Sequence, residues 1–235
     1  ISSSKNDGVT PSECARLFLR EDDKVIALVY EKYLKLLKEN NSVDFDDLLL
    51  KPVELFKKEP SILDKYQTRF KYILVDEYQD TNTIQFNISN LIHGENCKIC
   101  AVGDDAQCIY SFRGSKIENI QKFREKYSPL EFKLSINYRS TKTIVEAANK
   151  LIQNNEGQSS KILFTNNQKN PLMESKIKIM SSQDDKDEAR KVVEKIIELH
   201  NINKKTNDWE NFAILYRTHK QSEAFESQLK NSNEI

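Results

Sequence analysis

Two short apolar runs constrain the fold of this chain more than any other feature of its sequence. Tyr72-Ile-Leu-Val75 and Ile99-Cys-Ala-Val102 are continuous hydrophobic stretches, which are typical of strands buried on both faces of a parallel sheet. Between them, residues 81–92 have the pattern of a helix, and Gly94 stands where that helix would end. A strand, a crossover helix and a second strand in this order predict a βαβ unit, and therefore an α/β fold.

The sequence on either side of this unit predicts further elements. Apolar residues at three- and four-residue spacing between Val25 and Leu37 predict a helix. Residues 44–56 predict a second helix, which Pro52 should kink or break because proline lacks a backbone N–H. Downstream we expect, in chain order, a strand at 132–136, a helix capped by Ser140, a strand at 176–180, a helix at 187–199 and a strand at 212–216.

The charges of the chain are balanced, with 36 basic and 36 acidic side chains. A net charge of zero excludes a general electrostatic attraction to nucleic acid, so any such contact must be local. No apolar run approaches the roughly 18 residues of a membrane-spanning helix, and the polar start Ile1-Ser-Ser-Ser-Lys5 does not have the pattern of a signal peptide. We therefore expect an intracellular protein without a membrane partner, and the missing initiator Met suggests a fragment of a longer chain.

Four cysteines are too few for a disulfide framework in a chain of this length. Cys97-Lys-Ile-Cys100 has the C-x-x-C spacing of zinc and redox sites, and His93 precedes it. However, no second pair completes a tetrahedral site, and the pair leads directly into an apolar run. Buried strand thiols are therefore the preferred interpretation of these cysteines.

Asp76 and Glu77 follow the first apolar run directly and carry the clearest chemical signal. In open parallel sheets, ligands bind at the carboxyl ends of the strands. One carboxylate there can hold a Mg²⁺ that bridges nucleotide phosphates, and its neighbour can activate an attacking water. The pair taken alone is also compatible with an ordinary strand end.

Three sequence motifs, which include Asp76 and Glu77, occur in an order and spacing that resemble those of a known family. They are Asp76-Glu-Tyr-Gln-Asp80, Gly103-Asp-Asp-Ala-Gln-Cys-Ile-Tyr-Ser-Phe-Arg-Gly114 and Asn137-Tyr-Arg-Ser140. Together they closely resemble the UvrD/Rep/PcrA family of superfamily 1 DNA helicases, and the likeness covers essentially the whole chain. It implies partial RecA-like P-loop NTPase lobes with a helical insertion at the N-terminal end. It also implies an ATP-driven motor that moves 3′ to 5′ on single-stranded DNA and separates duplex.

The resemblance also implies roles for the residues of the nucleotide site, with ATP and Mg²⁺ as cofactors. Asp76 matches the Mg²⁺ ligand and Glu77 the residue that activates the hydrolytic water. Gln107 matches a polar sensor of the γ-phosphate, and Tyr138 an aromatic that stacks on adenine. Arg139 matches the arginine that reaches the γ-phosphate across the lobe interface, although an arginine considered alone is usually a solvated surface residue.

The same resemblance assigns a second group of residues to DNA. Tyr110, Phe112 and Phe45 match aromatics on which bases stack, Arg113 lies close to them, and Arg217 is a candidate phosphate contact. Without the family strings, the preferred interpretation of Tyr110 and Phe112 is one face of a strand packed in a core, and that of Phe45 is a hydrophobic staple. Solvated charge is the alternative for Arg217.

The chain departs from the family pattern in one important respect. None of its five glycines is followed by Lys and then Ser or Thr, so the phosphate-binding P-loop is absent from this sequence. We therefore expect the segment alone to be inactive as an ATPase. Its expected domains are a helical insertion at 1–68 (part of subdomain 1B), the second half of the first RecA-like lobe (1A) at 69–130, and the first part of the second lobe (2A) at 131–235.

Two other functions stay open at this point. The chain could belong to a noncatalytic, degenerate helicase-like DNA-binding module, or to a subunit of a helicase-nuclease. Expected partners are single-stranded DNA and junctions of single- and double-stranded DNA, with repair or replication proteins as further candidates. The expected compartment is the cytoplasm or nucleoid in a bacterium, and the nucleus or an organelle in a eukaryote.

Overall fold

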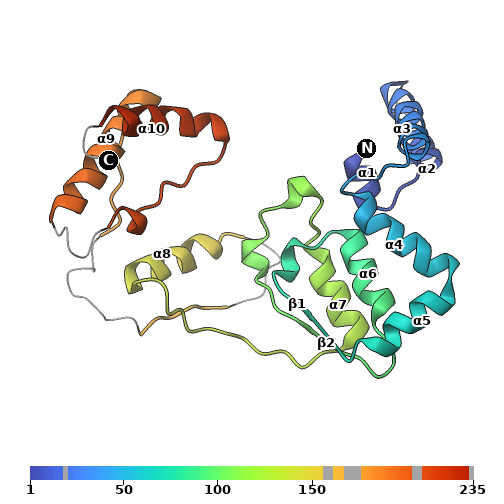
Figure 1. The fold of residues 1–235 in the computed structure, drawn as a ribbon. Helices are drawn as coiled ribbons and strands as arrows, with labels where there is room; N and C mark the ends of the chain where they lie inside the picture. The colour runs from blue at the N-terminus through green and yellow to red at the C-terminus, as the bar shows by residue number, and fades with distance from the viewer. Residues whose placement is uncertain (18–20, 156–160, 167–175, 203–207, 233–235) are drawn as a thin grey trace. The chain divides into compact units, whose positions relative to one another are not determined.

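The computed structural model describes residues 1–17, 21–155, 161–166, 176–202 and 208–232. The chain divides into two compact units, Ile1–Gln168 and Lys169–Ile235, which are treated separately below. Figure 1 shows the elements of each unit. No helix in the described ranges is both long and apolar enough to cross a membrane.

The first unit begins with a run of helices. Cys14, Ala27 and Tyr30 form a small buried cluster among them, because Ala27, Tyr30 and Leu34 recur at helical spacing on the face of the third helix that packs against the second. The helices are α1 (Ser2–Asn6), α2 (Pro11–Leu17), α3 (Glu21–Glu39), α4 (Asp47–Lys58) and α5 (Pro60–Arg69).

The start of α4 and its proline both differ from the sequence prediction. The helix begins at Asp47 rather than Asp44, because the Asp44 carboxylate accepts a hydrogen bond from the Asp47 N–H at 2.8 Å and ends a turn there. Pro52 lies inside the helix without breaking it. Val53 and Phe56 on the same helix are buried, so their packing offsets the hydrogen bond that proline cannot donate.

The βαβ unit is confirmed. Strand β1 (Tyr72–Val75) pairs in parallel with β2 (Lys98–Ala101), with Tyr72 opposite Lys98 and Val75 opposite Ala101. The crossover helix α6 (Thr83–Ile92) begins in a capping box, in which Asn82 and Gln85 each bind the other's backbone N–H.

Burial on both faces of the strands was predicted, and for β1 and β2 this is wrong. Ile73 and Val75 are half-buried, whereas Leu74 is 78% exposed, so the described residues cover only one face of the pair. Cys97 is buried just before β2, but Cys100 within it is exposed, which corrects the prediction of two buried strand thiols.

Helix α7 (Glu118–Tyr127) packs on the segment that follows β1 and contacts α6 through side chains. The Tyr127 hydroxyl donates to Asn90 Oδ1 at 2.6 Å, and the Phe123 ring meets the Tyr78 ring edge-on at 5.1 Å. Burial raises the pKa of Tyr78 to about 12. These contacts fix the residues that come immediately after the carboxyl end of β1.

The strand predicted at 132–136 is absent. Only an isolated parallel bridge joins Ile136 to Phe164, while Phe132 and Leu134 are exposed. Two backbone hydrogen bonds form this bridge: the Asn137 N–H donates to the Phe164 carbonyl at 2.8 Å, and the Phe164 N–H donates to the Ser135 carbonyl at 2.9 Å. Helix α8 (Lys142–Ile152) follows with Thr141 at its N-cap position, which corrects the predicted cap at Ser140.

The second unit contains α9 (Asp185–Ile202) and α10 (His219–Asn231), which pack against each other. The helix predicted at 187–199 is confirmed and is longer at both ends. The strands predicted at 176–180 and 212–216 are wrong, because both segments are irregular. Ile179 and Leu215 are almost fully exposed, so neither segment has the packing that a strand requires.

Candidate functional site

Asp76 and Glu77 lie where the sequence predicted, at the carboxyl end of β1. Glu77 has a left-handed backbone, with φ 47° and ψ 46°, a conformation that is uncommon for a residue with a side chain. The Tyr78 N–H donates to the Val102 carbonyl at 2.9 Å, and the Glu77 N–H donates to Asp76 Oδ1 at 3.0 Å. Strain of this kind concentrates at functional sites, so the conformation supports a role for Glu77.

A buried glutamine orients the Glu77 side chain. Gln79 is 1% exposed, and its Nε2 donates to Glu77 Oε2 at 2.7 Å. Its Oε1 accepts the Asp104 N–H at 2.9 Å. A Cβ at Gly103 would stand 2.8 Å from this Oε1, so the close approach requires glycine. Gln79 therefore links the end of β1 to the loop after β2.

Asp104 extends this link to Gln107. Its Oδ2 accepts from Gln107 Nε2 at 2.8 Å and pairs with Lys161 Nζ at 2.5 Å. Burial opposes ionisation of Asp104, but the hydrogen bonds from Lys161 and Gln107 outweigh it and lower the pKa of the carboxyl. The structure thus brings Asp76, Glu77 and Gln107 together at one edge of the strand pair.

Gln79, Asp104 and Lys161 were not identified as site residues from the sequence. Gln79 and Asp104 do fall within the strings that carried the resemblance, so their place in the sequence was the available signal. Lys161 had no such signal, because only the fold brings it to Asp104.

Tyr138 and Arg139 lie in an exposed turn before α8, and their side chains are not buried. The Asn137 Oδ1 accepts the backbone N–H groups of Arg139 at 3.0 Å and Ser140 at 2.7 Å, which forms a tight turn before α8. Tyr138 is 79% exposed, and Arg139 is exposed as well. Among the residues that the structure describes, no hydrogen bond or ion pair joins Arg139 to Asp76, Glu77 or Gln107.

Tyr110, Phe112 and Arg113 form an exposed aromatic and cationic cluster. The two rings lie 6.0 Å apart, and the Arg113 guanidinium stands 5.2 Å from the Tyr110 ring and 5.6 Å from the Phe112 ring. Phe112 is 69% exposed, and the segment is a short 3-10 turn (Ser111–Arg113) closed by Gly114 at φ 88°. The alternative of a core strand is therefore wrong for both aromatics.

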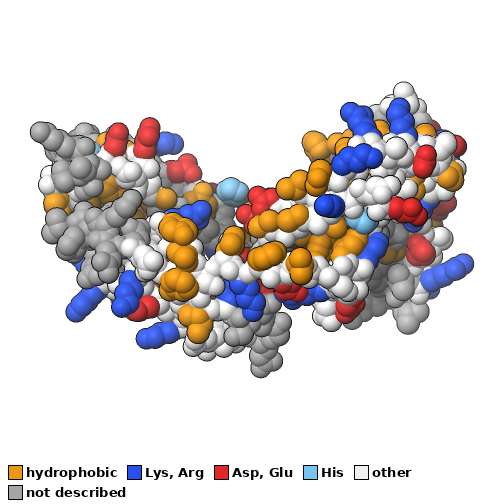
Figure 2. Space-filling model, turned by 90° about the horizontal axis from the view of Figure 1, so that it is seen from below, with side chains coloured by type: hydrophobic (Ala, Val, Ile, Leu, Met, Phe, Trp, Pro, Cys, Tyr) orange, Lys and Arg blue, Asp and Glu red, His pale blue; other side chains and the backbone are white. Residues whose placement is uncertain are grey.

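Phe45 belongs to the first unit of the chain and Arg217 to the second. Phe45 is 90% exposed in the turn before α4, so it does not pack as a hydrophobic staple. Arg217 belongs to the second unit and is exposed next to the capping box of α10, where its N–H donates to Gln221 Oε1 at 2.9 Å. Other exposed hydrophobic side chains are visible in the space-filling view of Figure 2.

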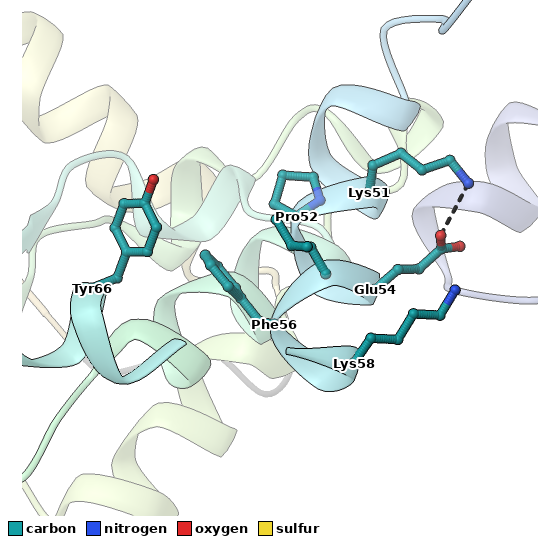
Figure 3. A pocket seen from close by; sticks show the side chains of 7 residues that line it. Lys51, Pro52, Glu54, Phe56, Lys58 and Tyr66 are labelled. Carbon is teal, nitrogen blue, oxygen red and sulfur yellow. Dashed lines mark hydrogen bonds and ion pairs between the residues drawn. The ribbon is translucent and has the colours of Figure 1, made fainter. Parts of the chain in front are cut away.

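An open pocket of about 540 Å³ lies between α4 and α5 (Figure 3). Phe56 and Tyr66 form part of its apolar wall, and Lys51 pairs with Glu54 at 3.0 Å on its rim. None of the residues predicted for the nucleotide or DNA site lines it. The candidate site is therefore the edge of the strand pair and not this pocket.

The fold and the edge carboxylates define an α/β protein of the kind that binds ligands at the carboxyl ends of parallel strands. The UvrD/REP helicase N-terminal domain model matches residues 1–128, and the UvrD-like helicase C-terminal domain model matches residues 132–235. The chain belongs to the UvrD/Rep helicase family, which confirms the resemblance and the α/β class.

Two curated relatives illustrate the similarity. The ATP-dependent DNA helicase PcrA of Staphylococcus aureus (strain Mu50) is 38% identical over 234 residues, which is 99% of this chain and 31% of the relative. The ATP-dependent DNA helicase PcrA of Staphylococcus epidermidis (strain RP62A) gives the same identity and coverage. The chain thus spans about 31% of the length of these relatives.

Proposed function

We propose that this chain is part of an ATP-dependent DNA helicase that moves 3′ to 5′ on single-stranded DNA and separates duplex at junctions. The observation that carries the proposal is the edge of β1 and β2, where Gln79 holds the Glu77 carboxylate in place beside Asp76. The family membership supports the same function, and so does the similarity to relatives that are ATP-dependent DNA helicases. We also propose that the protein contacts repair or replication proteins inside the cell.

We propose the same domain boundaries that the sequence analysis predicted. Residues 1–68 form a helical insertion, residues 69–130 the second half of the first RecA-like lobe, and residues 131–235 the first part of the second lobe. Helices alone occupy the described part of the first segment, and the paired strands lie in the second, which supports this division.

The residues at the edge suit Mg²⁺ because adjacent carboxylates supply the hard oxygen ligands that this ion prefers. Asp76 is the proposed ligand, and a Mg²⁺ bound there would neutralise charge on the nucleotide phosphates. Glu77 then accepts a proton from the attacking water, and the Gln79 amide keeps the Oε2 of Glu77 directed toward the edge. Gln107 donates toward the γ-phosphate from a side chain that Asp104 already orients.

Two exposed side chains complete the proposed nucleotide site. Tyr138 stacks on adenine, and Arg139 reaches the γ-phosphate with its planar donor fork. The exposure of both residues in a turn whose backbone Asn137 fixes supports these roles.

DNA contacts are assigned to the aromatic residues and their neighbouring cations. Tyr110 and Phe112 expose their rings beside Arg113, and Phe45 is fully available in its turn. Stacking suits a motor that must ignore sequence, because every base has a π-face. Arg217 is proposed as a further phosphate contact.

The experiment is a titration of fluorescent single-stranded DNA against the full-length protein and its Tyr110→Ala/Phe112→Ala variant. We expect affinity to fall by about 1–3 kcal/mol for each lost stack. Phe132→Ala is the matched control, because Phe132 is also an exposed aromatic residue but lies outside the cluster. An unchanged affinity in the double variant would exclude both aromatics from DNA binding.

A second experiment addresses the chemistry. Because this sequence lacks a Gly-Lys-Ser/Thr string, we propose that the purified chain alone releases no phosphate from ATP in the presence of DNA. DNA-stimulated release above the level of a Glu77→Gln control would contradict this.

A further inference from the structure

Lys5 is a buried lysine with two carboxylate partners. Its side chain is 0% exposed, and its Nζ lies 2.7 Å from Asp44 Oδ2 and 2.9 Å from Asp47 Oδ1. The Tyr33 hydroxyl donates to the same Asp44 oxygen at 2.8 Å. A charge this deeply buried requires such partners, so the group acts as one structural unit.

This unit holds both ends of the turn that exposes Phe45. Asp44 precedes Phe45, Asp47 begins α4 two residues after it, and Lys5 binds both carboxylates at once. The Asp47 N–H donates to Asp44 Oδ1 at 2.8 Å and closes the turn from within. The Phe45 ring therefore projects into solvent from a turn whose backbone is fixed.

Asn6 connects the same turn to α6. Its Nδ2 donates to Asp46 Oδ1 at 3.1 Å, and its Oδ1 accepts from Asn82 Nδ2 at 2.8 Å. Asn82 is the N-cap residue of α6. One side-chain amide thus joins the Phe45 turn to the helix between the two strands.

Asp7 connects the same N-terminal segment to the loop of residues 110–115, which carries Tyr110 and Phe112. Its carboxylate pairs with Lys116 Nζ at 3.1 Å, and the Lys116 N–H donates to the Thr81 carbonyl at 3.0 Å. The Ser115 N–H in turn donates to the Tyr110 carbonyl at 3.3 Å, which closes the loop of residues 110–115. Residues 5–7 therefore contact the supports of both exposed aromatic loops.

We propose that Lys5 and Asn6 are positioning residues that hold the Phe45 turn and the loop of residues 110–115 in one fixed arrangement for single-stranded DNA. Neither side chain touches the DNA, because Lys5 is buried and Asn6 faces Asp46 and Asn82. This inference rests on the proposed function, since it assumes that the aromatic residues bind bases.

Hydrogen exchange of the full-length protein tests the positioning without DNA. Lys5→Met removes the charge but keeps the aliphatic stem, and we expect faster exchange in peptides covering residues 42–47 with no change in β1 or β2. Lys35→Met is the matched control, because Lys35 is 75% exposed in a surface pair with Glu39. Unchanged exchange at 42–47 in Lys5→Met would overturn the proposal.

A double-variant cycle tests the consequence for DNA. Phe45→Ala should weaken single-stranded DNA binding at least about fivefold, which is the low end for one stacked base. If Lys5 acts through Phe45, Lys5→Met should weaken binding similarly, and the double variant should bind within about twofold of Phe45→Ala. Fully additive losses would overturn the proposal. No loss in Phe45→Ala would instead refute the DNA role of Phe45, and the exchange result would still decide the role of Lys5.

Asn6→Ala provides a second route if Lys5→Met does not fold. We expect it to accelerate exchange at both 42–47 and 110–116, because the amide binds Asp46 in the first turn and Asn82, which directly follows the Thr81 carbonyl that accepts the Lys116 N–H. Asn40→Ala is its control, since the exposed Asn40 amide donates to the Leu36 carbonyl of the neighbouring helical turn at the end of α3. Exchange that stays unchanged in both peptides of Asn6→Ala would overturn the proposal.

Discussion

The edge of β1 and β2 and the turn of residues 137–140 both carry residues proposed for ATP hydrolysis, but they are held in different ways. At the edge, hydrogen bonds fix side chains, as Gln79 does for Glu77 and Asp104 for Gln107. In the turn, the Asn137 carboxamide fixes only backbone N–H groups, and the side chains of Tyr138 and Arg139 extend into solvent.

The two regions therefore differ in how much side-chain freedom is lost when a ligand binds. A side chain already held by hydrogen bonds loses little freedom when the ligand binds, whereas the exposed side chain of Arg139 loses rotamer entropy at that moment. The edge is therefore organised in advance, and in the turn the ligand itself must order Arg139.

The largest expected effect is at the edge. Glu77→Gln in the full-length protein should lower ATP turnover by about 10²-fold or more, because the amide cannot accept a proton from water. The Gln79 contact survives, since an amide oxygen still accepts its hydrogen bond. Steady-state phosphate release measures the loss, and nucleotide affinity should stay nearly unchanged. Turnover within a few-fold of wild type would remove Glu77 from the chemistry.

Arg139→Lys tests the turn in the same assay. We expect a loss of about tenfold or more in turnover, because lysine keeps the charge but not the fork that spans two phosphate oxygens. Stability should change by less than about 0.5 kcal/mol, since the side chain is exposed. Thermal melts provide the folding control, and a fully active lysine variant would mean that Arg139 does not contact the phosphate.

A pair of truncations compares the two regions directly. Gln79→Ala should reduce the free energy of unfolding by about 1–3 kcal/mol, because it removes a buried amide that bonds both the Glu77 carboxylate and the Asp104 N–H. Asn137→Ala should cost about 0.5–1.5 kcal/mol, since water can replace its bonds in an open turn. Urea denaturation of both variants measures the difference, and equal losses would contradict the distinction between the regions.

Acid should lower the free energy of unfolding, because the Asp104 carboxylate at the edge of the strand pair becomes protonated. Its pKa is lowered in the folded protein, so its stabilising contribution is present above the unfolded value of about 3.9 and disappears as the pH falls through the folded value. Unfolding free energies measured at pH 5 and pH 3 should therefore fall more in wild type than in Asp104→Asn. Parallel pH dependence in the two proteins would show that Asp104 does not contribute.

The smallest effect is expected just after the turn. Lys142 pairs with Glu146 at 3.7 Å on the exposed surface of α8. Lys142→Ala should cost less than about 0.5 kcal/mol, because such surface pairs are well solvated. Chemical denaturation checks this, and a loss above 1 kcal/mol would indicate that the start of α8 is better organised than its exposure suggests.

Local sequence signals predicted the βαβ unit well. Its strands are compact apolar runs, and its helix begins at an Asn82–Gln85 capping box, so both depend on residues close in sequence. The edge residues Asp76 and Glu77 follow directly from the end of β1. Gln107 was placed by resemblance alone, and the structure shows how Asp104 holds it.

The remaining features depend on contacts between distant residues. Gln79 and Asp104 lie 25 positions apart, and nothing in either residue type predicts that their contact excludes a side chain at Gly103. The apolar segments 132–136, 176–180 and 212–216 had the composition of strands. Composition does not reveal whether a neighbouring strand supplies hydrogen-bond partners, and in the described structure these segments have at most an isolated bridge.

The left-handed backbone at Glu77 also has an evolutionary consequence. Glycine adopts this conformation without strain, and asparagine tolerates it better than glutamate does. Backbone strain therefore favours replacing this glutamate, whereas the hydrogen bond from the buried Gln79 amide and the proposed catalytic role both favour keeping it. Under the proposed role, relatives that have lost hydrolysis should carry other residues at this position more often than relatives that hydrolyse ATP.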